Sequence, residues 1–356
     1  MKELDMAFYR DRQLTNLASS VSVFAITIGL VVGQSATLIS LAAPSVANGA
    51  GATTVNALFT ALKSKLQLTY DAVGSGAGLK AFFAQTPTAG IPKPITFADS
   101  DDPVAGTEKV TGGRGYVQVP LVGVGITLAF NTKGLTVPAA GLKLSRASYC
   151  GILNGSITNW SNKSISADNG GQIALNVPIK VVRRADSSGS TFILSSHLNA
   201  ACKPAATTGI PAANVWNRGV GTTVNWPSTF IAATGGGGVI TAIANNPGGI
   251  GYVDNATLLA YDKANKPQLP SALLLNKAGK YIAVSPASIT AAIKDGKVVK
   301  YGTNLTRIDD LTDPKSASSY PISGATYFLY YSDLDFKGFI TAAKALAPSL
   351  GYGSVP

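Results

Sequence analysis

The sequence predicts an α/β protein, and its length favours two lobes over one. Short β-like runs alternate with helical patterns along the chain, which is typical of sheets covered by helices. The chain has 356 residues, of which 46% are hydrophobic and only 13% are charged, so it can bury a large core. Three turns rich in Gly, Ser and Thr each lead into an amphipathic helical pattern, at residues 49–54, 74–78 and 187–191.

The N-terminal region has the features of an export signal. Arg10 and Arg12 precede an apolar stretch at 21–32, and the small residues Ser45-Val46-Ala47 then resemble a signal-peptidase site. We therefore expect residues 1–47 to be a signal peptide, with a mature chain that starts near Asn48.

A retained membrane anchor is the competing interpretation of this leader. The leader is long, and apolar character resumes at 38–43. It contains no cysteine, which disfavours a lipid-anchored lipoprotein.

Each of the three turns is followed by apolar residues at helical spacing. After the first turn, Thr53 or Thr54 is the expected cap of a helix whose buried face holds Val55, Leu58, Phe59, Leu62 and Leu66. Shorter sets follow the other two turns, namely Leu79, Phe82 and Phe83, then Phe192, Ile193 and Leu198. Strands are expected at 67–73, 95–98, 126–130 and 179–182. The glycines at 235–238 are expected to form a tight loop that enters a helix.

The three turns together predict an anion site. A helix start leaves backbone N–H groups unpaired and carries the positive end of the helix dipole. Small residues there let an oxyanion approach the backbone closely. One such turn is usually only a cap, but three of them beside suitable charged residues indicate a binding site.

Arg184 and Asp101 are the charged residues that decide which anion is bound. Arg184 ends an apolar run directly before the third turn, and its guanidinium can offer a bidentate fork to an oxyanion. Asp186 can hold that fork in place, although the pair could also be an ordinary surface ion pair. A carboxylate such as Asp101 repels an anion unless the ligand brings a proton to donate. Phosphate keeps a proton at neutral pH and sulfate does not, so Asp101 favours phosphate.

Composition excludes several classes of function. The formal net charge is +11, but the basic residues are scattered and form no dense run, which argues against a nucleic-acid partner. A basic surface also attracts small anions toward a cleft. With two cysteines and one histidine, the chain cannot fill a typical zinc site, and we expect no metal and no cofactor.

Cys150 and Cys202 are expected to form a disulfide. An exported protein meets an oxidising compartment, where such a pair normally bonds. In the chain-entropy model, a disulfide that closes a loop of this length stabilises the fold by about 4 kcal/mol. Two buried free thiols are the alternative.

Six segments of the chain form a pattern when they are taken together. They are NGAGAT at 48–53, VGSG at 73–76, FADSDDP at 97–103, CGILNGSITNW at 150–160, VRRADSSGS at 182–190 and PGGIGYV at 247–253. In this order they resemble the periplasmic phosphate-binding proteins of bacterial phosphate ABC transporters, and especially their DING-type relatives. Each segment alone is weak evidence, but the six occur in the family's order and the match covers most of the mature chain. The cysteine pair also resembles a disulfide of the DING-type members.

The resemblance implies a set of phosphate ligands at matching positions. It implies the Thr53 hydroxyl, the Thr54 backbone N–H, Ser75, Asp101, Arg184, Ser188, the Gly189 N–H and Ser190, with Asp186 orienting the arginine. Two departures are expected to be harmless: Ser190 replaces the family's usual Thr, and Thr54 replaces an apolar residue while supplying only its backbone. Asp99 and Asp102 add negative charge beside Asp101, which could weaken the site or change its ligand.

The resemblance also implies a fold and a role. The fold is a type II periplasmic binding protein, in which two α/β lobes are joined by a two-stranded hinge and the ligand lies in the cleft. Lobe I would hold 48–121 and 256–356 and lobe II would hold 122–255, with chain crossings near 120–125 and 252–257. We expect a monomer, in the periplasm or at the cell surface or secreted, that carries inorganic phosphate to the membrane permease of an ABC transporter.

Two other functions stay open from the sequence. An exported surface or matrix protein could keep the fold with weak or altered anion binding. A Ser-dependent or phosphate-ester hydrolase would use Ser75 or Ser188, but the G-x-S-x-G pattern is absent and the sole histidine, His197, would have to be the base. We therefore expect no catalytic residues. His197 and the three tryptophans are expected to be structural.

Overall fold

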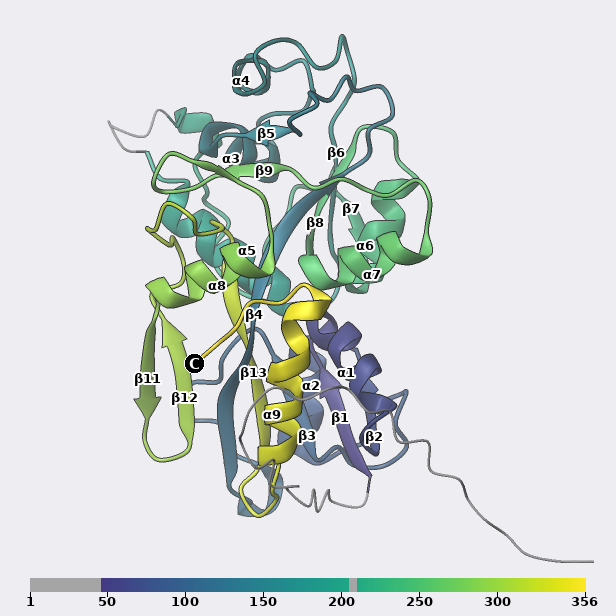
Figure 1. Cartoon of the computed structure of the whole chain (residues 1–356), viewed down its shortest axis with the longest axis vertical. Helices are drawn as coiled ribbons and strands as arrows, with labels where there is room; N and C mark the ends of the chain where they lie inside the picture. The colour runs from purple at the N-terminus through teal and green to yellow at the C-terminus, as the bar shows by residue number, and fades with distance from the viewer. Residues whose placement is uncertain (1–45, 205–209) are drawn as a thin grey trace, which may run out of the picture. The chain divides into compact units, whose positions relative to one another are not determined.

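A ten-stranded sheet forms the framework of the protein (Figure 1). The computed structural model describes residues 46–204 and 210–356. The main path of the sheet runs in the order β2 (Leu68–Asp71), β1 (Ala47–Gly51), β3 (Phe97–Ser100), β13 (Ser323–Tyr331), β4 (Tyr116–Phe130), β8 (Gly249–Asp254), β6 (Lys180–Arg184) and β7 (Ile231–Ala233). β12 (Leu305–Asp309) pairs with β4 and with β11 (Lys297–Tyr301).

The long strand β4 joins two halves of this sheet. Its first part, up to Gly125, pairs antiparallel with β13, and from Ile126 onward it pairs antiparallel with β8. On one side β1 pairs parallel with β2 and β3, and on the other β6 pairs parallel with β7 and β8. The change of partner falls beside 120–125, where the sequence predicts a chain crossing.

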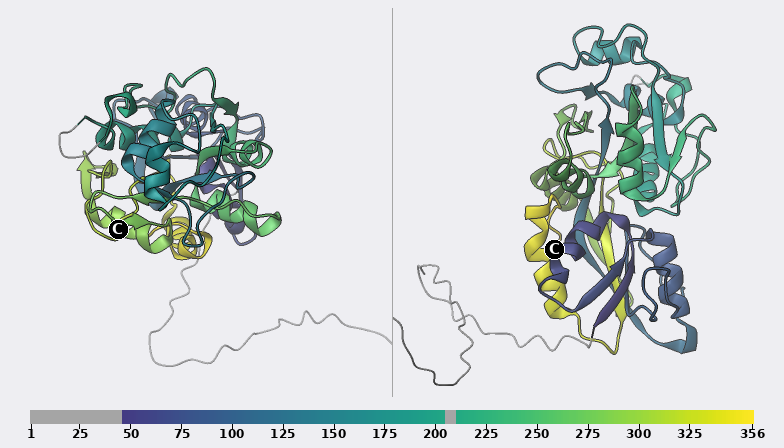
Figure 2. Two further views of the ribbon diagram at one scale, coloured as in Figure 1. Left: turned by 90° about the horizontal axis from the view of Figure 1, so that it is seen from above. Right: turned by 90° about the vertical axis from the view of Figure 1, so that its right-hand side faces the viewer.

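Helices cover both faces of the first half of the sheet. α2 and α9 lie on opposite faces (Figure 2), because alternate residues of β13 point to opposite sides: Phe328 packs with Phe339 of α9, and Leu329 with Phe82 of α2. The helices are α1 (Asn56–Lys63), α2 (Ser75–Ala84), α3 (Arg146–Asn154), α4 (Lys163–Asp168), α5 (Gly189–Ala201), α6 (Gly235–Ala244), α7 (Asn255–Ala264), α8 (Pro286–Asp295) and α9 (Lys337–Leu346). Short 3-10 turns are η1 (Thr53–Val55), η2 (Thr111–Gly113), η3 (Ala212–Asn214) and η4 (Ala347–Leu350).

A second, three-stranded sheet departs from the expected lobe assignment. It consists of β5 (Lys143–Leu144), β9 (Leu273–Leu275) and β10 (Tyr281–Ile282). The sequence places 256–356 in lobe I, yet β9 pairs parallel with β5, and Ser271 bridges to Ala129 of β4. Residues 271–282 therefore lie with elements of the 122–255 segment.

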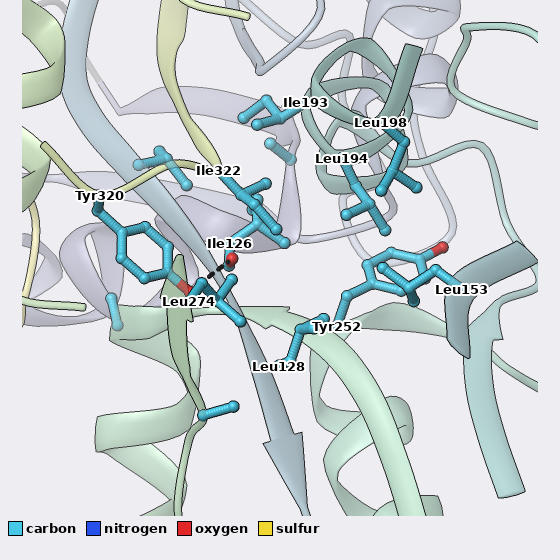
Figure 3. Packing of buried hydrophobic residues seen from close by; sticks show 14 of the residues in the cluster. Ile126, Leu128, Leu153, Ile193, Leu194, Leu198, Tyr252, Leu274, Tyr320 and Ile322 are labelled. Carbon is cyan, nitrogen blue, oxygen red and sulfur yellow. Dashed lines mark hydrogen bonds between the residues drawn. The ribbon is translucent and has the colours of Figure 1, made fainter. Parts of the chain in front are cut away.

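The core between β4, α3 and α5 fixes the position of the third turn. Ile126 and Leu128 of β4 and Leu194 of α5 belong to one buried cluster, part of which Figure 3 shows, and all three side chains are fully buried. Tyr320 donates a hydrogen bond to the Ile126 carbonyl at 3.2 Å. Burying each such side chain stabilises the fold by about 1.5–3 kcal/mol, which anchors α5 against β4.

The predicted disulfide is confirmed. Cys150 of α3 bonds to Cys202, which directly follows α5, and their Cα atoms are 5.8 Å apart. The bond links α3 to the end of the helix whose start carries the third turn.

Two local predictions are wrong. Thr53 and Thr54 do not cap a helix through their side chains, because η1 begins at Thr53 after an uncapped Ala52 and α1 follows only at Asn56. The glycines at 235–238 are the first turn of α6 and not a loop before it. Both errors have the same cause. The residue at which a helix starts depends on contacts between the turn and other segments, and a local sequence pattern does not contain those contacts.

The expected leader falls mostly outside the described residues, which begin at Val46. Ala47 is buried, opens β1 and donates a backbone hydrogen bond to Gln67 at 2.9 Å. The predicted mature start near Asn48 thus lies at the beginning of this strand. Within 46–204 and 210–356, no helix combines the length and the apolar character that crossing a bilayer requires.

Candidate functional site

The three predicted turns meet at one place. A Cβ atom added to Gly189, in the third turn, would lie 2.5 Å from the hydroxyl oxygen of Ser75 in the second turn and 2.5 Å from the Cβ of Asp101. Arg184 Nη1 donates to Thr53 Oγ1, in the first turn, at 3.1 Å. The sequence predicted these segments as one anion site, and the fold brings them into contact.

Arg184 is buried and held from several sides. Its side chain is 2% exposed, and its Nε donates to Asp186 Oδ1 at 2.8 Å while Nη2 pairs with Asp186 Oδ2. The Gly235 N–H, at the start of α6, also donates to Asp186 Oδ1 at 3.1 Å. Burial raises the pKa of Asp186, but the hydrogen bonds from Arg184 outweigh it and leave that pKa below its ordinary value. A buried, bidentate pair of this kind is not an ordinary surface ion pair.

Asp101 has one satisfied and one unsatisfied oxygen. Thr54 Oγ1 donates to Oδ1 at 2.7 Å, whereas Oδ2 is buried and has no hydrogen-bond partner among the described residues. A Cβ added to Gly189 would lie 2.6 Å from Oδ2, so this oxygen faces the start of α5. Burial, with the nearby charge of Asp254, raises the pKa of Asp101 to about 7. A ligand that donates a proton would satisfy this oxygen.

Thr54 contributes its side chain as well as the backbone N–H that the resemblance implies. Its hydroxyl donates to Asp101, and its carbonyl accepts a hydrogen bond from the Tyr352 hydroxyl at 2.5 Å. Because the first bond spans 47 residues of sequence, no local pattern contains it. The hydroxyl fixes which carboxylate oxygen of Asp101 stays open.

The start of α5 supplies small buried groups. Ser188 is its N-cap, and the serine hydroxyl accepts a hydrogen bond from the Thr191 N–H at 3.3 Å. Ser188, Gly189 and Ser190 are all buried. Ser188 can still donate its hydroxyl hydrogen, and the positive end of the α5 dipole points at the same place.

Asp99 and Asp102 are acids whose pKa values the fold raises, and Oδ2 of Asp99 has no hydrogen-bond partner among the described residues. The Asp99 carboxylate is buried against the hydroxyl of Thr326 on β13. Burial raises the pKa of Asp99 well above its ordinary range and that of Asp102 to about 6, with the charge of Arg307 opposing the latter shift. Raised pKa values keep these acids neutral over a wider pH range, which reduces their repulsion of an anion.

Sequence reasoning missed Asp254 and Tyr252. The Tyr252 hydroxyl accepts from the Arg184 backbone N–H at 3.0 Å, and Asp254 is a buried acid whose pKa burial raises to about 6. Asp254 caps α7 by accepting from the Thr257 N–H at 2.8 Å. Both residues lie in β8, and the PGGIGYV segment, which contains Tyr252 and directly precedes Asp254, was the available signal.

His197 is engaged away from the serine turns. Its Nε2 lies 3.0 Å from the Tyr149 hydroxyl and its Nδ1 lies 2.9 Å from the Thr312 carbonyl oxygen. Burial lowers the pKa of His197 to about 4. In the part of the chain that the structure describes, no three His, Cys, Asp or Glu side chains are grouped so that they could hold a metal ion.

Comparison with known proteins identifies the family. A family model described as a PBP superfamily domain matches residues 33–347. The phosphate-binding protein PstS 3 of Mycobacterium tuberculosis is 30% identical over 290 residues, which is 80% of this chain and 71% of that protein. The chain belongs to the PstS family of phosphate-binding proteins.

Solved structures agree with the PstS assignment. A high-affinity periplasmic phosphate-binding protein, PfluDING, whose structure contains phosphate, is 26% identical with a TM-score of 0.63, covering 88% of this chain and 91% of that one. A phosphate-binding protein from Stenotrophomonas maltophilia is 25% identical with a TM-score of 0.58, covering 84% and 82%. The predicted two-lobed, type II α/β fold and the DING-type resemblance are confirmed.

Replacing Asp101 of this PstS-family protein with Asn is expected to stabilise its ligand-free form at high pH. The folded pKa of about 7 lies above the unfolded value, so the site favours the neutral acid. The contribution of Asp101 to the free energy of unfolding is therefore complete below about pH 4 and is lost as the pH rises through 7. Asp101→Asn should raise the free energy of unfolding at pH 8 by on the order of 2 kcal/mol, and by much less at pH 4.5.

Urea unfolding of phosphate-free protein at both pH values measures this effect. Asp335→Asn, which changes an exposed carboxylate, is the matched control. Equal stabilisation at the two pH values would mean that burial does not destabilise the ionised form of Asp101.

Proposed function

We propose that this protein captures inorganic phosphate between Arg184, Asp101 and the start of α5, and delivers it to the permease of an ABC transporter. The observation that carries the proposal is the buried, unpartnered Oδ2 of Asp101, which faces Gly189 beside a buried arginine. Both the arginine and the helix start attract an anion, while the free carboxylate oxygen accepts only from a ligand that still holds a proton. Phosphate is the common oxyanion that meets both requirements near neutral pH.

Each ligand group has a defined part in this proposal. Arg184 neutralises the phosphate charge, with Asp186 fixing the plane of its guanidinium. The hydroxyls of Thr53, Ser75, Ser188 and Ser190 and the backbone N–H groups of Thr54 and Gly189 donate to phosphate oxygens. Oδ2 of Asp101 accepts a hydrogen bond from the O–H group of the phosphate, because Oδ1 already accepts one from the Thr54 hydroxyl.

A binding role is favoured over the alternatives. The relatives are named as binding proteins, and the only histidine of the sequence is bonded to Tyr149 and Thr312 instead of to a serine of the site. PfluDING is a periplasmic protein, and export of this chain to the periplasm fits both its leader and its disulfide. The complete burial of Ser75 and Ser188 suits a tight site more than a surface or matrix role.

Calorimetric titration of phosphate and sulfate tests the proposal. The protein is first unfolded and refolded to remove bound ligand. Phosphate should bind with micromolar or tighter affinity while sulfate does not bind. Absence of phosphate binding by well-folded protein would refute the proposed function.

Asp101→Asn should weaken phosphate binding and admit sulfate. The Thr54 hydroxyl will hold the amide oxygen, so the amide NH₂ takes the place of Oδ2 and offers a donor where an acceptor was. We expect the preference for phosphate over sulfate to fall by about 100-fold or more, as one reversed hydrogen bond costs ~1–3 kcal/mol for each anion. The same calorimetric titrations measure this change in preference. An unchanged preference would show that Asp101 does not distinguish a protonated ligand from an unprotonated one.

A further inference from the structure

Asp99 is a fully buried acid beside the site, and its carboxyl group has a single hydrogen bond. Its Oδ1 accepts from the hydroxyl of Thr326 on β13, whereas its Oδ2 has no hydrogen-bond partner among the described residues. The Asp99 backbone carbonyl accepts from the Ala52 N–H at 2.8 Å, directly before Thr53. Asp99 therefore lies next to the proposed phosphate ligands, although it is not one of them.

The groups that face Asp99 cannot balance a negative charge on it. They are Thr326 of β13, Asp101 after β3, Tyr70 of β2 and Tyr352 near the C-terminus. The Tyr70 hydroxyl donates to the Ala52 carbonyl at 2.9 Å. The Tyr352 hydroxyl donates to the Thr54 carbonyl at 2.5 Å, so neither phenol has a proton left for Asp99. These described groups include no cation, and a buried charge with one hydrogen bond and no counter-ion is costly.

Asp101 has the support that Asp99 lacks. Burial raises the pKa of Asp101, but the hydroxyls of Thr54 and Thr326 oppose this shift. The positive charge of Arg184 opposes it as well. Burial also raises the pKa of Asp99, where only Thr326 opposes the shift and the charge of Asp101 adds to it. Because the charges of the two acids repel each other, the pair holds on to one proton, and that proton stays on Asp99.

We propose that Asp99 keeps its proton in the phosphate-binding form of the protein, so that Asp101 is the only ionised acid of the pair, and that ionisation of Asp99 sets the upper pH limit of phosphate binding. A second negative charge would oppose both the charge of Asp101 and that of the bound phosphate. Asp99 is then a positioning residue, which acts through the charge at the site and does not touch the ligand. The inference rests on the proposed phosphate binding and adds to it a residue that sets its pH range.

Replacing Asp99 with Asn tests this role. Asn has the same shape and is neutral at every pH, and its amide oxygen can still accept from Thr326. The Kd for phosphate should lie within about twofold of the parent value at pH 6, whereas at pH 9.5 the parent should bind about 10-fold or more weakly than Asp99→Asn. The titration of phosphate itself is common to both proteins, so the ratio of the two Kd values isolates Asp99. Calorimetric titration of refolded protein measures both.

Asp102→Asn is the matched control. Burial raises the pKa of Asp102 to about 6, so this neighbouring acid is ionised above about pH 7.5 with or without the ligand. The ratio of its Kd to the parent value should stay constant between pH 7.5 and 9.5, while the ratio for Asp99→Asn changes.

The uptake of protons on binding gives an independent readout. At pH 9.5 phosphate is a dianion and Asp101, with a pKa of about 7, is ionised, so Asp99 is the group of this pair that can take up a proton. Titration in two buffers of different ionisation enthalpy should show uptake of up to about one proton by the parent and close to none by Asp99→Asn. A packing defect alone would change Kd and leave the proton count unchanged. If the variant does not refold, the parent still decides, because uptake of no proton at pH 9.5 would overturn the proposal.

The outcomes separate this inference from the proposed function. If the folded parent protein binds no phosphate at pH 6, the proposed function fails. If it binds phosphate but the parent and Asp99→Asn show the same pH profile, only the role of Asp99 is wrong.

Discussion

Arg184→Gln is expected to weaken phosphate binding by about 30- to 4,000-fold, the largest effect of any substitution considered. This range corresponds to ~2–5 kcal/mol, the usual cost of removing one partner of a buried charge pair. The guanidinium is 2% exposed and bonded to both Asp186 and Thr53, so its loss removes the ligand's positive partner and leaves the Asp186 carboxylate uncompensated beside the site. Calorimetric titration of refolded protein with phosphate measures the change.

Arg183→Gln is the matched control for this variant. Arg183 precedes Arg184 in β6, and side chains of successive strand residues point to opposite faces. Arg183→Gln removes one positive charge from the same strand, and its phosphate affinity should stay within about twofold of that of the parent protein. Equal losses in the two variants would mean that net charge, and not the position of Arg184, sets affinity.

Gly189→Ala is expected to reduce phosphate affinity by at least about 100-fold, or ~3 kcal/mol. The added methyl group would lie 2.5 Å from both the Ser75 hydroxyl oxygen and the Asp101 Cβ, closer than real Cβ atoms approach their neighbours. The start of α5 must therefore move away from the first two turns, and the ligand loses groups from both sides at once.

Gly189→Ala is also expected to lower the stability of the ligand-free protein, because the added methyl group overpacks a buried contact. Overpacking of this kind usually costs about 1–3 kcal/mol, so the variant should still fold. Thermal unfolding of the ligand-free variant measures this loss and shows that the titrated protein is folded. Gly171→Ala, at an exposed glycine with open space, should change neither property. Phosphate binding of parental strength by Gly189→Ala would place the ligand elsewhere.

Much of the candidate site was predictable because its parts are local motifs. A Gly/Ser-rich turn before a helix is encoded within six residues, and Arg184 with Asp186 lies directly before such a turn. The disulfide followed from a count of two cysteines in a chain with an export signal. Short-range chemistry of this kind can be recognised from sequence.

The contacts that tune the site were not predictable. The bond from Thr54 to Asp101 spans 47 residues, and that between Asp99 and Thr326 spans 227. Pairing of β9 with β5 likewise joins residues about 130 positions apart, which is why the assignment of 271–282 to lobe I did not anticipate it. Asp254 was missed because its proximity to Arg184 and Asp101 comes from the order of β6 and β8 in the sheet.

The family, the α/β class, the disulfide and the groups suited to an anion could all be inferred from the amino-acid sequence. Those properties depend on residue types at fixed short spacing, which the chain carries before it folds. Folding alone leaves one oxygen of Asp101 without a partner and brings Gly189 into contact with Ser75. Burial and long-range packing set these properties, because the free energy of a buried carboxylate depends on every segment that surrounds it.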